Sequence, residues 1–215
     1  MILTRLRTAD AVVLGTLAVM VLALVGTAWS QEDLYGPQAP VDVAYVRAVN
    51  VLDEGGLAVR VADGELEVLG FAGATAYVAV APGPVRLDLG GEETVIDVEI
   101  GDFVTVFATR EGALTIEDTP LRDASRGMLA LYNLTDHESL ALVVVDGPIV
   151  VEGVGPGTQA SVAIAEAEVA LSVRGGAETI DLEVRHFERG VAHAVIVAAG
   201  ADGLIVAYVA SRLDD

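Results

Sequence analysis

Hydrophobic and polar positions alternate along most of the chain, in short runs separated by turn residues. In Val43–Asn50 the odd-numbered residues share one face and the even-numbered residues the other, as in a β-strand. Later runs are divided by Asp63-Gly64, by Pro82-Gly83-Pro84 and by Gly90-Gly91, which are turn signals. The pattern predicts about eight short strands in the first half of the chain, with Arg47 on a solvated strand face.

The same order of landmarks recurs roughly eighty residues later, at a period typical of tandem repeats. Leu129–Asn133 ends on an asparagine as Val46–Asn50 does, and the later landmarks follow in the same order. The matched turns are Ala62-Asp63-Gly64 with Val145-Asp146-Gly147, and Gly90-Gly91 with Gly175-Gly176. The repetition predicts two homologous domains, residues 31–118 and 128–215, with a linker at 119–127 and a leader at 31–42.

Each repeat has the features of a β-sandwich: short strands, frequent turns and no convincing helical period. Ala160–Val173 contains good helix formers, Ala and Glu, yet its apolar residues alternate, which favours two strands. The predicted fold class is therefore all-β, with two tandem homologous β-sandwich domains after a cleaved signal peptide.

The N-terminal segment has the three parts of a signal peptide. Arg5 and Arg7 are basic, Ala11–Val25 is apolar and uncharged, and Ala28-Trp29-Ser30 provides small residues at a cleavage site. We expect residues 1–30 to be removed after Ser30. An uncleaved membrane anchor is the alternative, because the apolar run approaches the length of about 20 residues that spans a bilayer.

The composition excludes several kinds of chemistry and partner. The chain has no cysteine, so it forms no disulfide and has no thiolate nucleophile. With 32 acidic and 12 basic residues its formal net charge is -20, which repels nucleic acid, anionic lipid and anionic polysaccharide and favours cationic partners. A soluble surface shaped by genome composition or a saline habitat explains the same charge.

Residue types suited to catalysis or metal binding are few. The sequence has no Gly-x-Ser-x-Gly, His-Glu-x-x-His or phosphate-loop motif. We expect His137 to be solvated in a turn, His186 to be solvated or ion-paired in a polar loop, and His193 to be a core or edge residue of a strand. Four carboxylates that are close in sequence favour a solvated sheet face over a calcium site; they are Glu92, Glu93, Asp97 and Glu99. No catalytic, cofactor-binding or metal-binding residue is predicted.

The leader and first strand carry a resemblance to a known family. Leu34-Tyr35-Gly36-Pro37, then Pro40, then Ala44–Asn50 resembles the mature N-terminus of the alginate O-acetylation accessory protein family, AlgF. The length, the export signal and the second unit with its asparagine-terminated strand also fit. The resemblance implies a periplasmic protein needed to acetylate an exported polyuronate, without a catalytic centre of its own.

The resemblance also implies partners. These are periplasmic SGNH-type acetyltransferases and the membrane-bound O-acyltransferase of the alginate machinery, while contact with the acidic polymer would be indirect or weak. Leu34, Tyr35, Pro37 and Arg47 are the predicted partner-binding residues. Two alternatives remain: an acetyl carrier or acetyltransferase that uses an unrecognised serine, such as Ser161 or Ser172, and a polysaccharide-binding module, which the 5% aromatic content disfavours.

Overall fold

The computed structural model describes residues 42–212, apart from 54, 121–122, 124 and 202. Every regular element in this part of the chain is a β-strand, which confirms the predicted all-β class. The predicted signal peptide and the leader residues Leu34, Tyr35 and Pro37 lie outside the described residues. Within the described residues, no helix has the length and apolar character needed to cross a membrane.

The first half of the described chain forms two four-stranded sheets. Sheet A has the strand order β4-β1-β7-β8 and sheet B has the order β3-β2-β5-β6. The strands are β1 (Ala44–Asn50), β2 (Leu57–Val61), β3 (Glu67–Leu69), β4 (Val78–Val80), β5 (Gly83–Leu89), β6 (Glu92–Val98), β7 (Phe103–Thr109) and β8 (Gly112–Glu117).

The second half repeats this arrangement. Sheet C has the order β12-β9-β17-β18 and sheet D the order β11-β10-β14-β15, and β13 pairs with β16 in a small additional sheet. The strands are β9 (Gly127–Leu134), β10 (Leu140–Val144), β11 (Ile149–Val154), β12 (Thr158–Ile164), β13 (Ala167–Val169), β14 (Leu171–Gly175), β15 (Glu178–Asp181), β16 (Arg185–Phe187), β17 (Val191–Gly200) and β18 (Gly203–Arg212).

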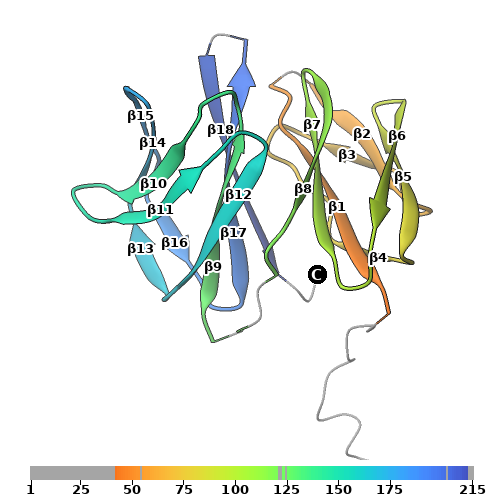
Figure 1. The fold of residues 1–215 in the computed structure, drawn as a ribbon, viewed down its shortest axis with the longest axis horizontal. Coiled ribbons are helices and arrows are strands. Elements are labelled where there is room, and N and C mark those ends of the chain that lie inside the picture. Colours follow the sequence, from red (N-terminus) through yellow and green to blue (C-terminus); the bar gives the residue numbers. More distant parts are fainter. Residues whose placement is uncertain (1–41, 54, 121–122, 124, 202, 213–215) are drawn as a thin grey trace, which may run out of the picture. The chain divides into compact units, whose positions relative to one another are not determined.

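The two halves have the same topology (Figure 1). Each strand of sheets A and B has a counterpart at the same place in the order of sheets C and D; β1 corresponds to β9, for example, and β7 to β17. In both halves one pair in an otherwise antiparallel sheet is parallel: β1 with β7, and β9 with β17. The predicted tandem repeat is therefore confirmed at the level of strand connectivity, and the strands predicted within Ala160–Val173 are present as β12, β13 and β14.

Three apolar clusters hold the sheets together. One, which includes Val46 and Leu87, lies between sheets A and B, and another, which includes Leu131 and Leu142, lies between sheets C and D. The third joins sheet A to sheet C through residues such as Phe107, Tyr132 and Ile196. Sheets A and C are thus covered on both faces, and Val41–Asp215 forms one compact unit. Gly127, expected in the linker, is the first residue of β9.

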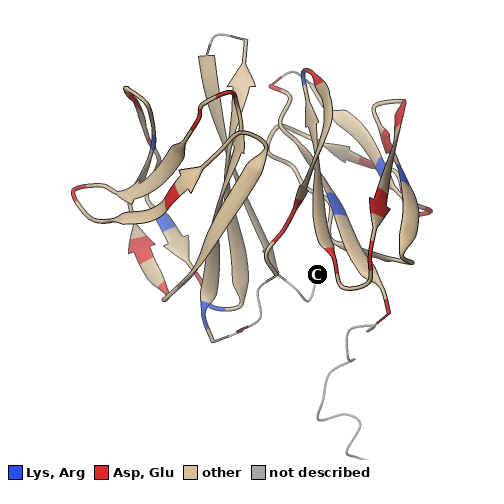
Figure 2. Cartoon of the chain, in the orientation of Figure 1, with Lys and Arg blue, Asp and Glu red and all other residues tan. Residues whose placement is uncertain are grey.

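Burial of the central strands on both faces corrects one expectation. Arg47 was predicted on a solvated face of the first strand, but sheet C covers that face and the residue is only 4% exposed. Arg47 is also the only Asp, Glu, Lys or Arg within β1, β7, β9 and β17, all four of which are fully described. Most acidic residues lie on outer strands and turns (Figure 2), as a solvated acidic surface requires.

Candidate functional site

Arg47 lies at the centre of a buried polar cluster. The parallel pairing of β1 with β7 places it directly beside Thr105, and its Nε donates to the Thr105 hydroxyl at 2.8 Å. Its Nη1 donates to the Ser211 hydroxyl of β18 at 3.0 Å, and its guanidinium lies 4.6 Å from the ring centroid of Tyr77. The five guanidinium N–H groups allow one side chain to reach several elements at once.

Asp118, which directly follows β8, provides the negative charge of the cluster. It is 6% exposed and accepts three hydroxyl hydrogen bonds. Thr105 at 2.5 Å and Tyr77 at 2.6 Å donate to Oδ2, and Tyr132 at 2.6 Å donates to Oδ1. Thr105 therefore accepts from the cation and donates to the carboxylate, so that the two charges are linked through one hydroxyl.

The surroundings keep the Arg47 guanidinium and the phenols of Tyr77 and Tyr132 protonated. Burial by itself lowers the pKa of Arg47, but interactions with Tyr77, Tyr132 and Asp118 outweigh it and the pKa is raised. Burial is the largest cause that raises the pKa of Tyr77 and of Tyr132 above that of a free phenol. In Tyr132 the negative charge of Asp118 is the second cause. At neutral pH the guanidinium is charged and the phenols are hydrogen-bond donors, so the cluster holds charge instead of transferring protons.

The cluster connects the two sandwiches. Arg47, Tyr77, Thr105 and Asp118 come from the first half, and Tyr132 and Ser211 come from strands of the second half; these six residues are called the Arg47 cluster below. The Phe107 and Tyr132 rings, whose centroids are 5.3 Å apart, extend the contact into the apolar cluster between sheets A and C. Arg47 as a partner-binding residue stays a prediction, although a partner would meet little of this buried side chain.

The repeated asparagines have the same structural role in both halves. Asn50 and Asn133 are fully buried at the ends of β1 and β9. Each Oδ1 accepts from the backbone N–H two residues ahead, at 2.9 and 3.0 Å respectively. Each Nδ2 donates to two carbonyl oxygens of neighbouring segments: Leu69 and Gly70 in the first half, His137 and Val154 in the second. The repeated asparagine is therefore a buried amide at or next to the last residue of its strand, and it closes the turn beyond it.

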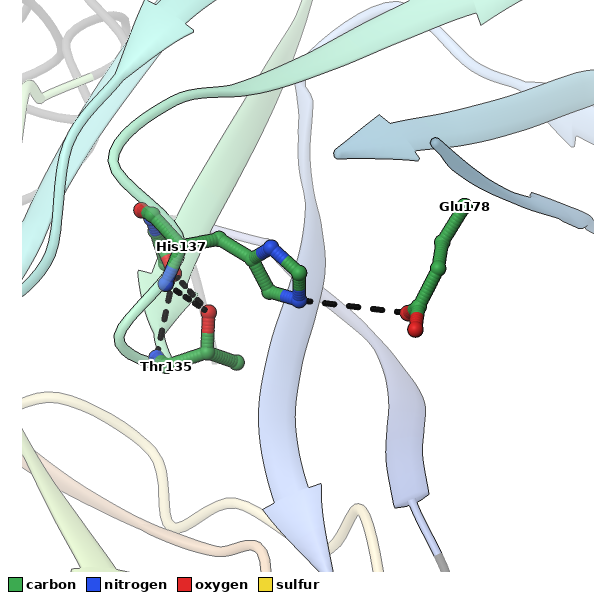
Figure 3. Close-up of polar contacts among 4 residues, drawn as sticks. Thr135, His137 and Glu178 are labelled. Atoms are coloured by element: carbon green, nitrogen blue, oxygen red, sulfur yellow. Dashed lines mark hydrogen bonds and ion pairs between the residues drawn. The ribbon is translucent and has the colours of Figure 1, made fainter. Parts of the chain in front are cut away.

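The turn after Asn133 positions His137. Its backbone N–H donates to the Thr135 hydroxyl at 3.1 Å, and its Nε2 lies 3.8 Å from a Glu178 carboxylate oxygen (Figure 3). The side chain is half-buried and not the fully solvated turn residue that was expected. Since the Thr135 hydroxyl donates to Asn133, the backbone contact of His137 belongs to the turn after Asn133, whereas its side chain approaches Glu178 of β15.

His193 is the buried strand residue that the sequence indicates, whereas His186 lies in strand β16 and not in the predicted polar loop. His186 is exposed, with its Nε2 3.9 Å from Glu166. His193 is buried in β17, where its Nε2 accepts from the Glu188 N–H at 3.2 Å and its Nδ1 contacts the Tyr208 hydroxyl at 2.5 Å. The acceptor role of Nε2 assigns the proton to Nδ1, and burial lowers the pKa of the imidazole, so that the ring is neutral at neutral pH.

The serines and carboxylates considered from the sequence are not brought into a site. Ser172 is 2% exposed in β14 and Ser161 lies in β12, whereas the hydrogen-bond partners of the described histidines are other residues. The carboxylates near β6 are exposed, as expected. Among the described residues no group of three or more potential metal ligands is present. Phe71 is the exposed aromatic side chain of the described part, which gives a sugar ring few stacking surfaces.

Sequence reasoning missed Tyr77, Thr105, Asp118 and Tyr132. They come from four separate segments, and no local motif relates them. One signal was available: a single charged residue in the otherwise uncharged strand Ala44–Asn50 is typical of a buried, paired charge and not of a solvated face.

The fold and its polar centres define a class of protein: a tandem repeat of one β-sandwich, joined by a buried charge cluster and a shared apolar core. Comparison with known sequences gives the family. Residues 16–194 match the family described as "Alginate O-acetyl transferase AlgF", and the chain belongs to this family, which acts in alginate O-acetylation. The resemblance found in the leader and the first strand is thereby confirmed.

One relative and two solved structures are also similar to the chain. The chain is 26% identical over 160 residues to the alginate biosynthesis protein AlgF of Pseudomonas aeruginosa, a match that covers 73% of each chain. Two solved structures are domains of AlgF from P. aeruginosa. The C-terminal domain is 25% identical, with a TM-score of 0.37, and matches 40% of this chain and 99% of its own. The N-terminal domain is 21% identical, with a TM-score of 0.33, and matches 38% and 100%.

Proposed function

We propose that this protein is a non-catalytic periplasmic adaptor for alginate O-acetylation, which docks SGNH-type acetyltransferases and the membrane-bound O-acyltransferase of the machinery. Family membership supports the pathway. The observation that carries the adaptor role is the Arg47 cluster: its ionisable groups are buried and mutually hydrogen-bonded, and they hold the two sandwiches to each other. A rigid pair of modules is suited to presenting fixed surfaces to partners.

Charge supports docking to proteins over gripping the polymer. A formal net charge of -20 repels an anionic polyuronate at low salt, whereas basic patches on a partner protein are attracted. The leader residues Leu34, Tyr35 and Pro37 provide an apolar, aromatic segment with no counterpart before the second sandwich. In this proposal the leader contacts a partner, and the sandwiches supply further surface.

Co-purification tests the proposal. Residues 31–215 should retain a periplasmic acetyltransferase of the same organism in low salt, and the bound fraction should fall as salt is added. Changing Tyr35→Ala and Pro37→Ala together should weaken the complex about tenfold, equal to about 1.4 kcal/mol, with an unchanged circular dichroism spectrum. Gln38→Ala, in the same leader, is the matched control and should bind as the unaltered protein does.

Two results would contradict the adaptor role. One is the absence of any complex with the acetyltransferase or the O-acyltransferase in low salt. The other is stoichiometric acetylation of the purified protein by an activated acetyl ester that is lost in Ser161→Ala or Ser172→Ala, because this would make the protein a carrier or an enzyme.

A further inference from the structure

Strand β18 forms an edge of sheet C. It pairs with β17 along its whole length, from Gly203 opposite Gly200 to Arg212 opposite Val191, and no described strand pairs with its other side. Alternate residues of an antiparallel edge strand direct their backbone N–H and C=O groups away from the neighbour. Gly200 and Gly203 flank a two-residue hairpin loop, so every second residue from Leu204 is outward-directed, which includes Val206, Tyr208 and Ala210. These groups can accept an added strand.

The edge of β18 lacks the features by which proteins usually block strand addition. From Gly203 to Ser211 it carries no charged residue and no proline. Other described edges differ: β3, β4, β13 and β16 are short, β6, β8 and β15 carry acidic residues, and β11 pairs with β10 through register shifts. At the opposite edge of sheet C, Gln159 of β12 hydrogen-bonds to Thr119 at 2.9 Å.

An apolar cavity adjoins this edge. Its volume is about 470 Å³, within the range of about 300–1,000 Å³ found for ligand pockets. Leu204, Val206 and Tyr208 of β18 form one wall, Leu182 and its neighbours after β15 form another, and Phe71, which is 45% exposed, lies at the rim. The side chains of an added strand that point to one face could enter this cavity, while its backbone pairs with β18.

The rim of the cavity is acidic. Asp181 and Glu183 line it together with one cation, Arg185. The Arg185 guanidinium lies 3.2 Å from a Glu183 carboxylate oxygen and 4.8 Å from the ring centroid of Tyr208, so its charge is already engaged. The rim and the formal net charge of -20 both favour a segment that carries lysine or arginine.

We propose that β18 and the adjoining cavity are a docking site for an extended, basic segment of a partner protein, which adds to sheet C as a further strand and places alternate apolar side chains in the cavity. The inference rests on the proposed adaptor function, since it specifies one surface through which a partner is held. Backbone pairing provides the affinity, and the cavity and the acidic rim provide the selectivity.

A synthetic peptide tests the site directly. The probe is an acetylated peptide of the length of β18 in which lysine and valine alternate, and its binding to residues 31–215 is measured by fluorescence polarisation in low salt. A second peptide has the same sequence with N-methyl groups along its central half, which removes backbone donors but keeps charge and side chains. We expect it to bind about tenfold or more weakly, because at least two backbone hydrogen bonds to β18 are lost.

Variants locate the binding edge. Val206→Pro removes an outward N–H and obstructs the edge, while the pairing with β17 remains possible. Val95→Pro is the matched control, because Val95 is also an outward-directed residue of an edge strand. It lies three positions after Glu92, the first residue of β6 after the hairpin turn, just as Val206 lies three positions after Gly203, the first residue of β18. Val206→Pro should lower peptide affinity about tenfold, whereas Val95→Pro should leave it unchanged.

Several outcomes would overturn the inference: no binding of the probe, equal binding of the N-methylated peptide, or equal losses in the two proline variants. Self-association that disappears in Val206→Pro would assign the edge to a second copy, and tighter probe binding after removal of residues 31–41 would assign it to the protein's own leader. If Val206→Pro does not fold, comparing the binding of the plain and the N-methylated peptides to the unaltered protein still tests the inference. Survival of the acetyltransferase complex in a folded Val206→Pro would refute this site and leave the adaptor function standing.

Discussion

Asp118→Asn is the sharpest perturbation of the contact between the two sandwiches. The change keeps the shape of the side chain but removes its charge, and one of its two acceptor atoms becomes a donor. The Tyr132 hydroxyl on Oδ1 or the pair of hydroxyls on Oδ2 then loses its acceptor. Arg47, at 4% exposure, is left without its neighbouring negative charge.

The magnitude follows from this burial. Leaving one charge of a buried pair uncompensated costs about 3–5 kcal/mol, and we expect this cost here because the Arg47 and Asp118 charges are buried and linked through the Thr105 hydroxyl. With a dependence on urea of about 2 kcal/mol per molar, the unfolding midpoint should fall by about 1.5–2.5 M. Far-ultraviolet circular dichroism of residues 31–215 is the assay, since Trp29, the one tryptophan of the chain, precedes this segment. The exposed Asp97→Asn is the matched control and should change stability by no more than about 0.5 kcal/mol.

A double-mutant cycle with Arg47→Met separates the charge interaction from packing. In the double variant both charges are gone, so its loss of stability should be smaller than the sum of the two single losses by about 2 kcal/mol. The reasoning is refuted if the two losses add to within about 0.5 kcal/mol, or if Asp118→Asn costs no more than Asp97→Asn.

Two further predictions concern stability. Asn50→Ala and Asn133→Ala should each lower the free energy of unfolding by about 2–4 kcal/mol, because each buried amide makes at least three hydrogen bonds of about 1 kcal/mol. Thermal melts in which either variant has the melting temperature of the unaltered protein would contradict this. Burial lowers the pKa of His193 from about 6.5, so its contribution to stability is complete above that pH and is lost as the pH falls through it towards the folded-state pKa. Between about pH 7 and 5 the urea midpoint should therefore fall more steeply for the unaltered protein than for His193→Phe; parallel pH profiles would disprove the assignment.

The strand pattern could be predicted from the sequence because it depends on local alternation and turn residues. The repeated asparagines could be found too, since Asn50 and Asn133 stand at matching positions near the ends of the first strand of each repeat. Alternation shows which residues share a face, but it does not show what covers that face. Tyr45, Arg47 and Val49 were correctly assigned to one face, but Arg47 was incorrectly placed in solvent, because sheet C covers that side of β1.

The Arg47 cluster required the tertiary structure. Arg47 contacts Ser211 across 164 positions of sequence, and Asp118 contacts Tyr77 across 41. Such contacts depend on the order of strands in the sheets and on the packing of one sandwich against the other. Neither produces a recognisable spacing between residues in the sequence. The unprotected edge at β18 was likewise hidden, since an uncharged alternating strand reads the same whether it has one neighbour or two.

The parallel pairing of β1 with β7 also determines the order in which the chain can fold. The first strand of each sandwich pairs with a strand near the end of the same repeat, as Arg47 does with Thr105 over 58 positions. A growing chain therefore holds β1 without this neighbour until nearly the whole repeat has been made, and the same delay recurs for β9. Contacts of such long range give slow folding. Sheets A and C can therefore be completed only after most of their repeat has been made.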